Sequence, residues 1–163
     1  MVKSLVGSKV NILKMNIKIS LKNISLYCSL VFISIIMLYS GITKFVDVFQ
    51  FINTLSYYKY IPNQLHVIIG YIVPILEVLI GLLIWHRPLR NYMLFTYKIL
   101  IFSFILLLII HYGSYMPYGC GCLGTNDAET IDYLIILRDG ICIIPAYIYS
   151  ILAKQRIFIT EQT

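Results

Sequence analysis

Four long runs of apolar residues, separated by short polar segments, dominate the pattern of this chain. Each run approaches the roughly 20 residues that a helix needs to cross the apolar core of a bilayer. The runs extend from about Ile24 to Ile42, Leu65 to Trp85, Met93 to Tyr112 and Tyr133 to Ala153. None shows the alternation of a barrel strand, and an open sheet would leave backbone groups unsatisfied in lipid. The pattern predicts an all-α, four-transmembrane-helix bundle, although Arg138, Asp139 and Pro145 interrupt the fourth run.

Composition supports a membrane protein and excludes several other classes. Apolar residues make up 60% and charged residues 12% of the chain, against roughly 45–50% and 25% in soluble domains. Mean hydropathy is +0.85. The charge is too sparse for a disordered chain or for nucleic-acid binding. Hydrolysis and phosphoryl transfer find no support, because a phosphate-binding glycine loop, an HExxH motif and a serine with a plausible base are all missing from the sequence.

The distribution of basic residues predicts the orientation in the membrane. Basic residues gather before the first run, between the second and third runs and after the fourth: Lys3, Lys9, Lys14, Lys18, Lys22, His86, Arg87, Arg90, Lys154 and Arg156. All three segments lie on one side of a four-span chain, so the positive-inside rule places both termini in the cytoplasm. The connections 43–64 and 113–132 then face outward and carry only Lys44 and Lys59 as basic residues. We therefore expect a multi-pass protein of the bacterial inner membrane.

The same reasoning divides the chain into three parts. Residues 1–23 would form a basic cytoplasmic tail, 24–153 the four-helix transmembrane domain and 154–163 a second cytoplasmic tail. A removable signal peptide is not expected, because neither an apolar core nor a small-residue cleavage site precedes Ile24.

The first outward connection is rich in aromatic side chains. These are Phe45, Phe49, Phe51, Tyr57, Tyr58 and Tyr60. Such residues favour a short helix in the membrane interface, here ended by Pro62, as part of an aromatic belt.

The sharpest chemical feature is the segment 118–124, Tyr-Gly-Cys-Gly-Cys-Leu-Gly, in the second outward connection. Cysteines one residue apart close a disulfide only in restricted backbone conformations, which the three glycines permit. An exposed, strained pair outside the plasma membrane favours thiol–disulfide exchange at Cys120 and Cys122. Two alternatives remain open. One is a structural crosslink, which would stabilise little across so short a loop. The other is a Cu(I) or zinc site completed by Met116 or His111.

The remaining cysteines form no evident second pair. Cys142 falls near the middle of the fourth run and Cys28 near the cytoplasmic end of the first. We expect both to act as small buried apolar residues.

Ionisable residues inside the spans are candidates for function, because inserting each costs roughly 2.5–3.5 kcal/mol. Glu77 and Lys98 are expected at similar depth, where they would form a structural pair. Arg138 and Asp139 are expected nearer the outer surface, below the cysteines. Arg138 would hydrogen-bond a quinone carbonyl or reach inward to Glu77, and an equally good interpretation is a charged layer that packs the helices. His111 is expected to be an interfacial residue rather than a ligand.

Five motifs taken together resemble a known family. They are Ser40-Gly-Ile-Thr-Lys-Phe45, Pro62, Pro74-Ile-Leu-Glu77-Val-Leu-Ile-Gly81, Cys120-Gly-Cys122-Leu-Gly124 and Leu137-Arg138-Asp139. In this order and spacing they are similar to the MauE family of four-helix membrane proteins, which is related to DoxX-type proteins. The resemblance covers roughly residues 24–153. Leu123 departs from it, since the family usually carries phenylalanine there.

The resemblance implies a role in the maturation of other proteins. MauE proteins are associated with methylamine metabolism, as maturation factors for the disulfide-rich small subunit of methylamine dehydrogenase. Relatives also occur where no such enzyme is made, so only disulfide handling on the outer face carries over. In architecture alone, the chain is similar to quinone-coupled thiol oxidases of the DsbB and VKOR type.

The leading hypothesis is that Cys120 and Cys122 exchange disulfides with a periplasmic thioredoxin-like protein or client. Electrons would pass to a membrane quinone near Arg138. A relay of the DsbB type needs a second cysteine pair, which the partner would supply. The alternative is a non-catalytic membrane scaffold or metal-binding subunit for a periplasmic partner.

Overall fold

The computed structural model describes residues 2–121 and 128–160, with side chains described for 23–121, 128 and 130–154. The helices are α1 (Val2–Val46), α2 (Val48–Ser56), α3 (Asn63–Leu83), α4 (Arg90–Ile110) and α5 (Tyr133–Thr160), and the strands β1 (Tyr115–Met116) and β2 (Glu129–Thr130) pair antiparallel. Within these ranges four helices are long and apolar enough to cross a membrane: Asn23–Val46 of α1, α3, α4 and Tyr133–Lys154 of α5. The predicted four-transmembrane-helix bundle is confirmed.

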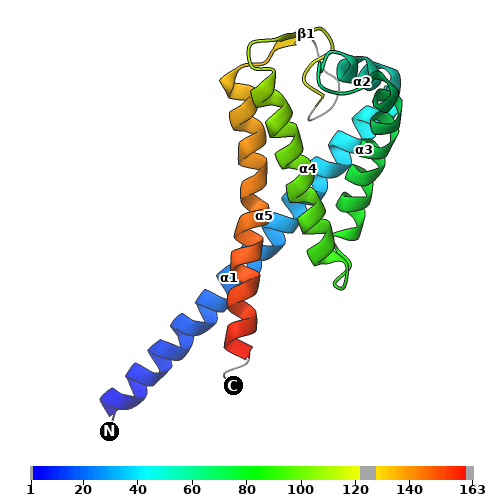
Figure 1. Cartoon of the computed structure of the whole chain (residues 1–163). Coiled ribbons are helices and arrows are strands. Elements are labelled where there is room, and N and C mark those ends of the chain that lie inside the picture. The colour runs from blue at the N-terminus through cyan, green and yellow to red at the C-terminus, as the bar shows by residue number, and fades with distance from the viewer. Residues whose placement is uncertain (1, 122–127, 161–163) are drawn as a thin grey trace.

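The four long helices close into a ring. α1 packs against α3 and α5, and α4 packs against the same two helices from the other side. Figure 1 shows α2 and the β1–β2 pair at one end of this bundle and both termini at the other. A chain with an even number of spans has both termini at the same end of the bundle. The assignment of the terminal end to the cytoplasm stays a prediction from the charge distribution.

Two helices extend further than the apolar pattern predicts. α1 begins at Val2, so the predicted N-terminal tail is the first part of the same helix and projects beyond the bundle (Figure 1). α5 ends at Thr160, beyond the predicted end at Ala153. It also continues through Arg138, Asp139 and Pro145 without a break. A helix in apolar surroundings keeps its backbone hydrogen bonds because no water competes for them, so one proline does not end it.

α2 confirms the predicted short helix after the first span, with different ends. Asp47 is its N-cap, and the carboxylate accepts a hydrogen bond from the Gln50 backbone N–H at 3.0 Å. The helix ends at Ser56, before Pro62 is reached. Pro62 instead has an extended backbone and precedes the first turn of α3, a place where its missing N–H costs nothing.

Small residues let α1 and α3 approach closely. A methyl group on Gly41 would lie 2.7 Å from the Val78 side chain, and one on Gly81 would lie 2.7 Å from Leu38. Glycines at such crossings allow two membrane helices to pack backbone against backbone. The contact brings the last turns of α1 against Glu77, in the middle of α3.

Candidate functional site

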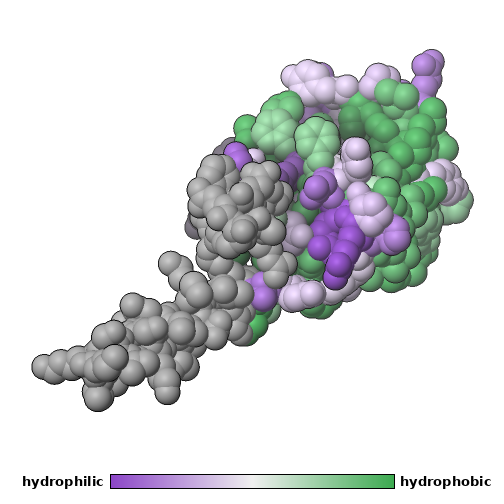
Figure 2. Space-filling model, turned by 90° about the horizontal axis from the view of Figure 1, so that it is seen from below, coloured by the Kyte–Doolittle hydropathy of each residue, from purple (hydrophilic) through white to green (hydrophobic). Residues whose placement is uncertain are grey.

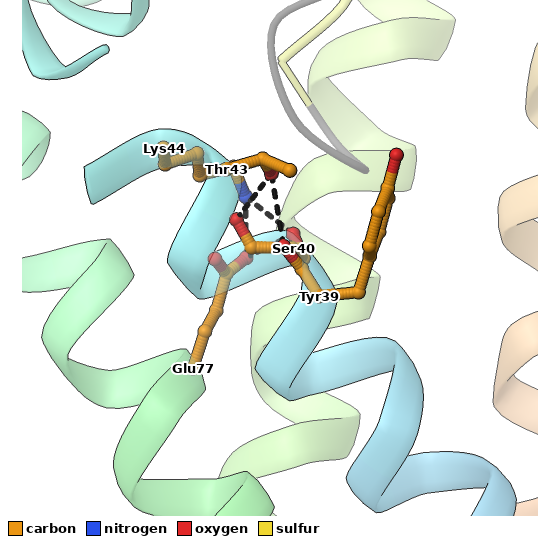
Figure 3. A network of polar contacts seen from close by, with 5 residues as sticks. All are labelled: Tyr39, Ser40, Thr43, Lys44 and Glu77. Carbon is orange, nitrogen blue, oxygen red and sulfur yellow. Dashed lines mark hydrogen bonds and ion pairs between the residues drawn. The ribbon is translucent and has the colours of Figure 1, made fainter. Parts of the chain in front are cut away.

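A buried ion pair joins the end of α1 to α3. Lys44 and Glu77 have side chains that are 0% exposed, and the Lys44 Nζ lies 2.5 Å from Glu77 Oε1. The Lys44 ammonium also donates to Ser40 Oγ at 3.0 Å, and that hydroxyl donates to Glu77 Oε1 at 3.1 Å. Figure 3 shows the three side chains converging between the two helices. We call these three residues the α1–α3 cluster.

Two aromatic rings complete the surroundings of the Lys44 ammonium. Its nitrogen lies 5.1 Å from the centre of the Phe51 ring and 4.9 Å from that of Phe104. Aromatic faces attract cations, most strongly where water is excluded. The charge of Lys44 is therefore balanced from several sides without solvent.

This arrangement corrects two predictions from the sequence. Lys44 does not lie in an outward loop, because α1 extends to Val46 and keeps the lysine in its last turn. The predicted Glu77–Lys98 pair is wrong as well. Lys98 donates to Ser150 Oγ at 2.7 Å and lies 4.8 Å from the Tyr147 ring centre. The signal that was missed is the spacing of Ser40 and Lys44, which puts both on one helix face.

Cys120 lies beside the only arginine of α5 within the span. Its Sγ accepts a hydrogen bond from Arg138 Nη2 at 3.3 Å, and the residue is 4% exposed. Arg138 Nε donates to Asp139 Oδ1 at 3.1 Å, with side chains 36% and 4% exposed respectively. The sequence-based alternative in which Arg138 reaches Glu77 is not what these contacts show. Its contact with a quinone stays a prediction.

The backbone around Cys120 is held against α2. We call residues 117–121 the cysteine loop. Gly119 and Gly121 have φ values of +76° and +73°, in the left-handed region where glycine is favoured. Tyr58, buried at 2% exposure, donates its hydroxyl to the Cys120 carbonyl at 2.7 Å. A methyl group on Gly121 would lie 3.2 Å from the Phe51 ring, so Phe51 contacts the cysteine loop as well as Lys44.

The aromatic residues of the first outward connection therefore divide into two groups. Phe51 and Tyr58 are buried and build the floor of the cysteine loop. Phe49 and Tyr60 are 77% and 70% exposed, as an interfacial belt requires. The aromatic belt predicted from the sequence therefore accounts for the exposed residues only.

In each of the two ion pairs that the structure describes, Lys44–Glu77 and Arg138–Asp139, one carboxylate oxygen has no hydrogen-bond partner. Among the described residues, Glu77 Oε2 and Asp139 Oδ2 are buried and have no hydrogen-bond partner. Buried polar atoms are usually paired, so such exceptions call for a reason.

The other candidates have structural surroundings. The Cys142 carbonyl accepts a hydrogen bond from the Tyr97 hydroxyl, and the residue is buried as expected. Cys28 is exposed on α1, so the expectation of burial is wrong there. His111 is buried at 8% exposure and its Nε2 accepts from the Lys59 backbone N–H at 3.2 Å. Its ring thus ties the first outward connection to the end of α4.

The partner of Cys120 in the predicted pair, Cys122, lies outside the described residues, so the disulfide is not tested. The alternative of a metal site also needs Cys122 and is likewise not tested. Met116, one of its suggested ligands, is buried at 1% exposure.

Fold and site together define a multi-pass membrane protein that carries a cysteine loop beside an arginine–aspartate pair at one end of a four-helix bundle. The chain belongs to the MauE family. The family model described as methylamine utilisation protein MauE matches residues 21–152, most of the chain. Neither a curated protein nor a solved structure matches it.

Proposed function

We propose that this MauE-family protein exchanges disulfides with periplasmic proteins through Cys120 and Cys122. The observation that carries the proposal is the hydrogen bond from Arg138 to the Cys120 sulfur, at 3.3 Å, with the cysteine 4% exposed. A cation beside a cysteine sulfur stabilises the thiolate, which is the reactive form in exchange. Packing alone does not require a guanidinium at that sulfur.

We assign different roles to the two cysteines from the burial of Cys120 alone. Cys120 is 4% exposed, so an incoming thiolate of a partner protein would attack the sulfur of Cys122. The Cys120–Cys122 bond breaks, a mixed disulfide forms between Cys122 and the partner, and Cys120 leaves as a thiolate. A more stabilised leaving thiolate departs faster. Arg138 would therefore act as the group that holds the negative charge on Cys120.

The second half of the exchange releases the partner. Its other thiolate attacks its own sulfur in the mixed disulfide and displaces Cys122. The partner gains a disulfide, and two electrons and two protons have passed to Cys120 and Cys122.

Turnover needs a two-electron oxidant, for which we propose a membrane quinone that leaves as the hydroquinone. The partner would be a thioredoxin-like protein or a disulfide-rich client. In the family this client would belong to amine metabolism, as the name methylamine utilisation suggests. We propose the bacterial inner membrane as the location, with the cysteine loop on the periplasmic side.

The test is a comparison of the two single cysteine variants. Both are made on a Cys28→Ser, Cys142→Ser background, so that only the loop cysteines remain. Cells are quenched with acid and proteins are separated without reduction. We expect Cys120→Ser to accumulate a mixed disulfide with the oxidised partner, because the Cys122 thiolate attacks the partner's disulfide in the reverse reaction and no Cys120 thiolate remains to displace the reduced partner from Cys122. Cys122→Ser should form none.

The same background measures the resting state. An impermeant maleimide that adds mass should label the intact loop of whole cells only after reduction. Labelling without reduction, together with the absence of mixed disulfide in both variants, would contradict the proposal and favour the scaffold role. Absence of labelling in either state would instead place the cysteine loop on the cytoplasmic side.

A further inference from the structure

A second candidate site lies at the opposite end of the bundle from the cysteine loop. A groove of about 330 Å³ opens between α4 and α5. Apolar walls come from Leu94, Phe95 and Ala153, and polar groups come from Lys98, Ser150 and Lys154. The groove is open on the outer surface of the bundle, where its wall residue Phe95 is 64% exposed.

Among the residues that the structure describes, no carboxylate forms an ion pair with the lysines of this groove. The described ion pairs are Lys44–Glu77 and Arg138–Asp139, and none of these four residues lines the groove. Lys98 has the hydroxyl of Ser150 as its hydrogen-bond acceptor. The acidic residues of the chain lie at positions 47, 77, 127, 129, 132 and 139, apart from Glu161 in the undescribed C-terminus.

A neighbouring arginine adds a third cation. Arg90 donates to the Tyr149 hydroxyl at 3.1 Å and to the backbone carbonyls of Ile84 and Trp85. Its acceptors are neutral, so its charge adds to that of the lysines. Figure 2, which looks at the molecule from the end that carries both termini, shows hydrophilic side chains gathered within an otherwise apolar surface.

We propose that this groove binds one anionic phospholipid. Lys98 and Lys154 would contact the phosphate, and one acyl chain would lie along Leu94, Phe95 and Ala153. Basic pockets between membrane helices recognise anionic headgroups, and a lysine side chain within a span can extend its ammonium toward the headgroups. Ser150 holds the Lys98 ammonium in place through its hydroxyl, and that contact leaves two of the three ammonium protons for the phosphate. The site is independent of the proposed exchange chemistry.

Native mass spectrometry of the purified protein in detergent tests the proposal. Phosphatidylglycerol is titrated against phosphatidylcholine with the same acyl chains. We expect one phosphatidylglycerol to bind before any phosphatidylcholine does. Lys98→Gln and Lys154→Gln should each weaken that first binding step about fivefold, and the double variant by about the product of the two.

Lys59→Gln is the matched control, because it removes the same charge from an exposed residue in the first outward connection. Lys98→Arg keeps the charge and should retain binding. Equal binding of both lipids, or equal losses in Lys59→Gln and the double variant, would overturn the proposal. The proposal would also be overturned if a short-chain quinone displaced the bound lipid and excess phosphatidylglycerol did not. Lys154 is exposed, so its substitution tests binding without disturbing the packing of the bundle.

Discussion

The two ion pairs that the described residues form differ in what they connect. Lys44 and Glu77 come from different helices, 33 residues apart, and neither side chain is exposed. Arg138 and Asp139 are neighbours on α5, and the arginine side chain is 36% exposed. A pair within one helix cannot hold two helices together. The guanidinium of Arg138 instead continues to the Cys120 sulfur.

The comparison separates assembly from chemistry. The α1–α3 cluster lies where glycines bring two helices together, and its loss should disturb the packing of the bundle. The Arg138–Asp139 pair lies under a loop that is held by Tyr58, and its loss should disturb the reactivity of a sulfur. Variants in each region should therefore change different measurements.

The largest effect is expected from Lys44→Met. It leaves the Glu77 carboxylate buried without its cation, which typically costs about 3–5 kcal/mol of stability. Thermal unfolding in detergent measures the loss. The double variant Lys44→Met, Glu77→Leu should recover most of it, since both charges are then removed.

Lys98→Met is the matched control for that experiment. It removes the same ammonium from a span, but the hydrogen-bond partner there is a serine hydroxyl. We expect a loss of about 1 kcal/mol or less. Equal losses in the two lysine variants would mean that the α1–α3 cluster does not assemble the bundle.

The next effect is expected in kinetics rather than stability. Arg138→Gln removes the cation beside Cys120, and a hydrogen bond to a charged group contributes about 1.5–3 kcal/mol. Exchange with a reduced thioredoxin-like dithiol should slow by at least about tenfold. Stopped-flow tryptophan fluorescence or quenched gel samples follow the rate.

Two companion variants separate charge from packing at this position. Arg138→Lys keeps the charge and should fall between wild type and Arg138→Gln. Arg138→Gln, Asp139→Asn removes both charges, and so tests whether slow exchange comes only from an unbalanced Asp139. An unchanged rate in both Arg138→Gln variants would remove Arg138 from the proposed mechanism.

The sequence predicts the four spans because apolar length alone sets them. It also identifies Cys120, Arg138 and Asp139 as neighbours in depth, since helical rise fixes how far each lies from an outer loop. The ion-pair partner of Glu77 could not be predicted in this way. Depth along a span suggested Lys98, whereas Lys44 reaches Glu77 because α1 continues past the apolar run, to Val46.

The role of the aromatic residues was out of reach for a related reason. Phe51 and Phe49 lie two positions apart, and a short helix turns one inward and the other outward. Which of them faces the cysteine loop depends on how α2 rests on the bundle. No local pattern in the sequence encodes that.

A glycine next to each ion pair offers a third comparison. A methyl group on Gly41 would lie 2.7 Å from Val78 and 3.1 Å from the Pro74 carbonyl oxygen, which cannot move freely. Gly41→Ala should therefore cost about 1–3 kcal/mol. A methyl group on Gly140 meets nothing within 4 Å, so Gly140→Ala should be neutral or stabilise its helix by up to about 1 kcal/mol.

Thermal unfolding of both alanine variants in the same detergent measures the difference. Equal midpoints would mean that α1 and α3 are free to separate at Gly41. The α1–α3 cluster would then depend on its charges alone rather than on close backbone packing.

The smallest effect, and the finest distinction, concerns two tyrosines that donate to cysteine carbonyls. Tyr58 donates to Cys120 in the cysteine loop, and Tyr97 donates to Cys142 inside the bundle. Both rings are buried, at 2% and 0% exposure. Replacing either by phenylalanine removes one hydrogen bond and leaves a buried carbonyl, a change that costs about 0.5–1.5 kcal/mol. The losses of stability should therefore be similar.

Reactivity should tell the two tyrosine variants apart. Of the two tyrosines, Tyr58 is the one that holds the backbone of Cys120, whose sulfur lies beside Arg138. Tyr58→Phe should therefore slow disulfide exchange a few-fold. Tyr97→Phe should leave the rate near wild type. Both rates are measured at a temperature well below either unfolding midpoint. If the two variants slowed exchange equally, the effect would come from general loosening of the fold, and α2 would not be the support that holds the cysteine loop in register.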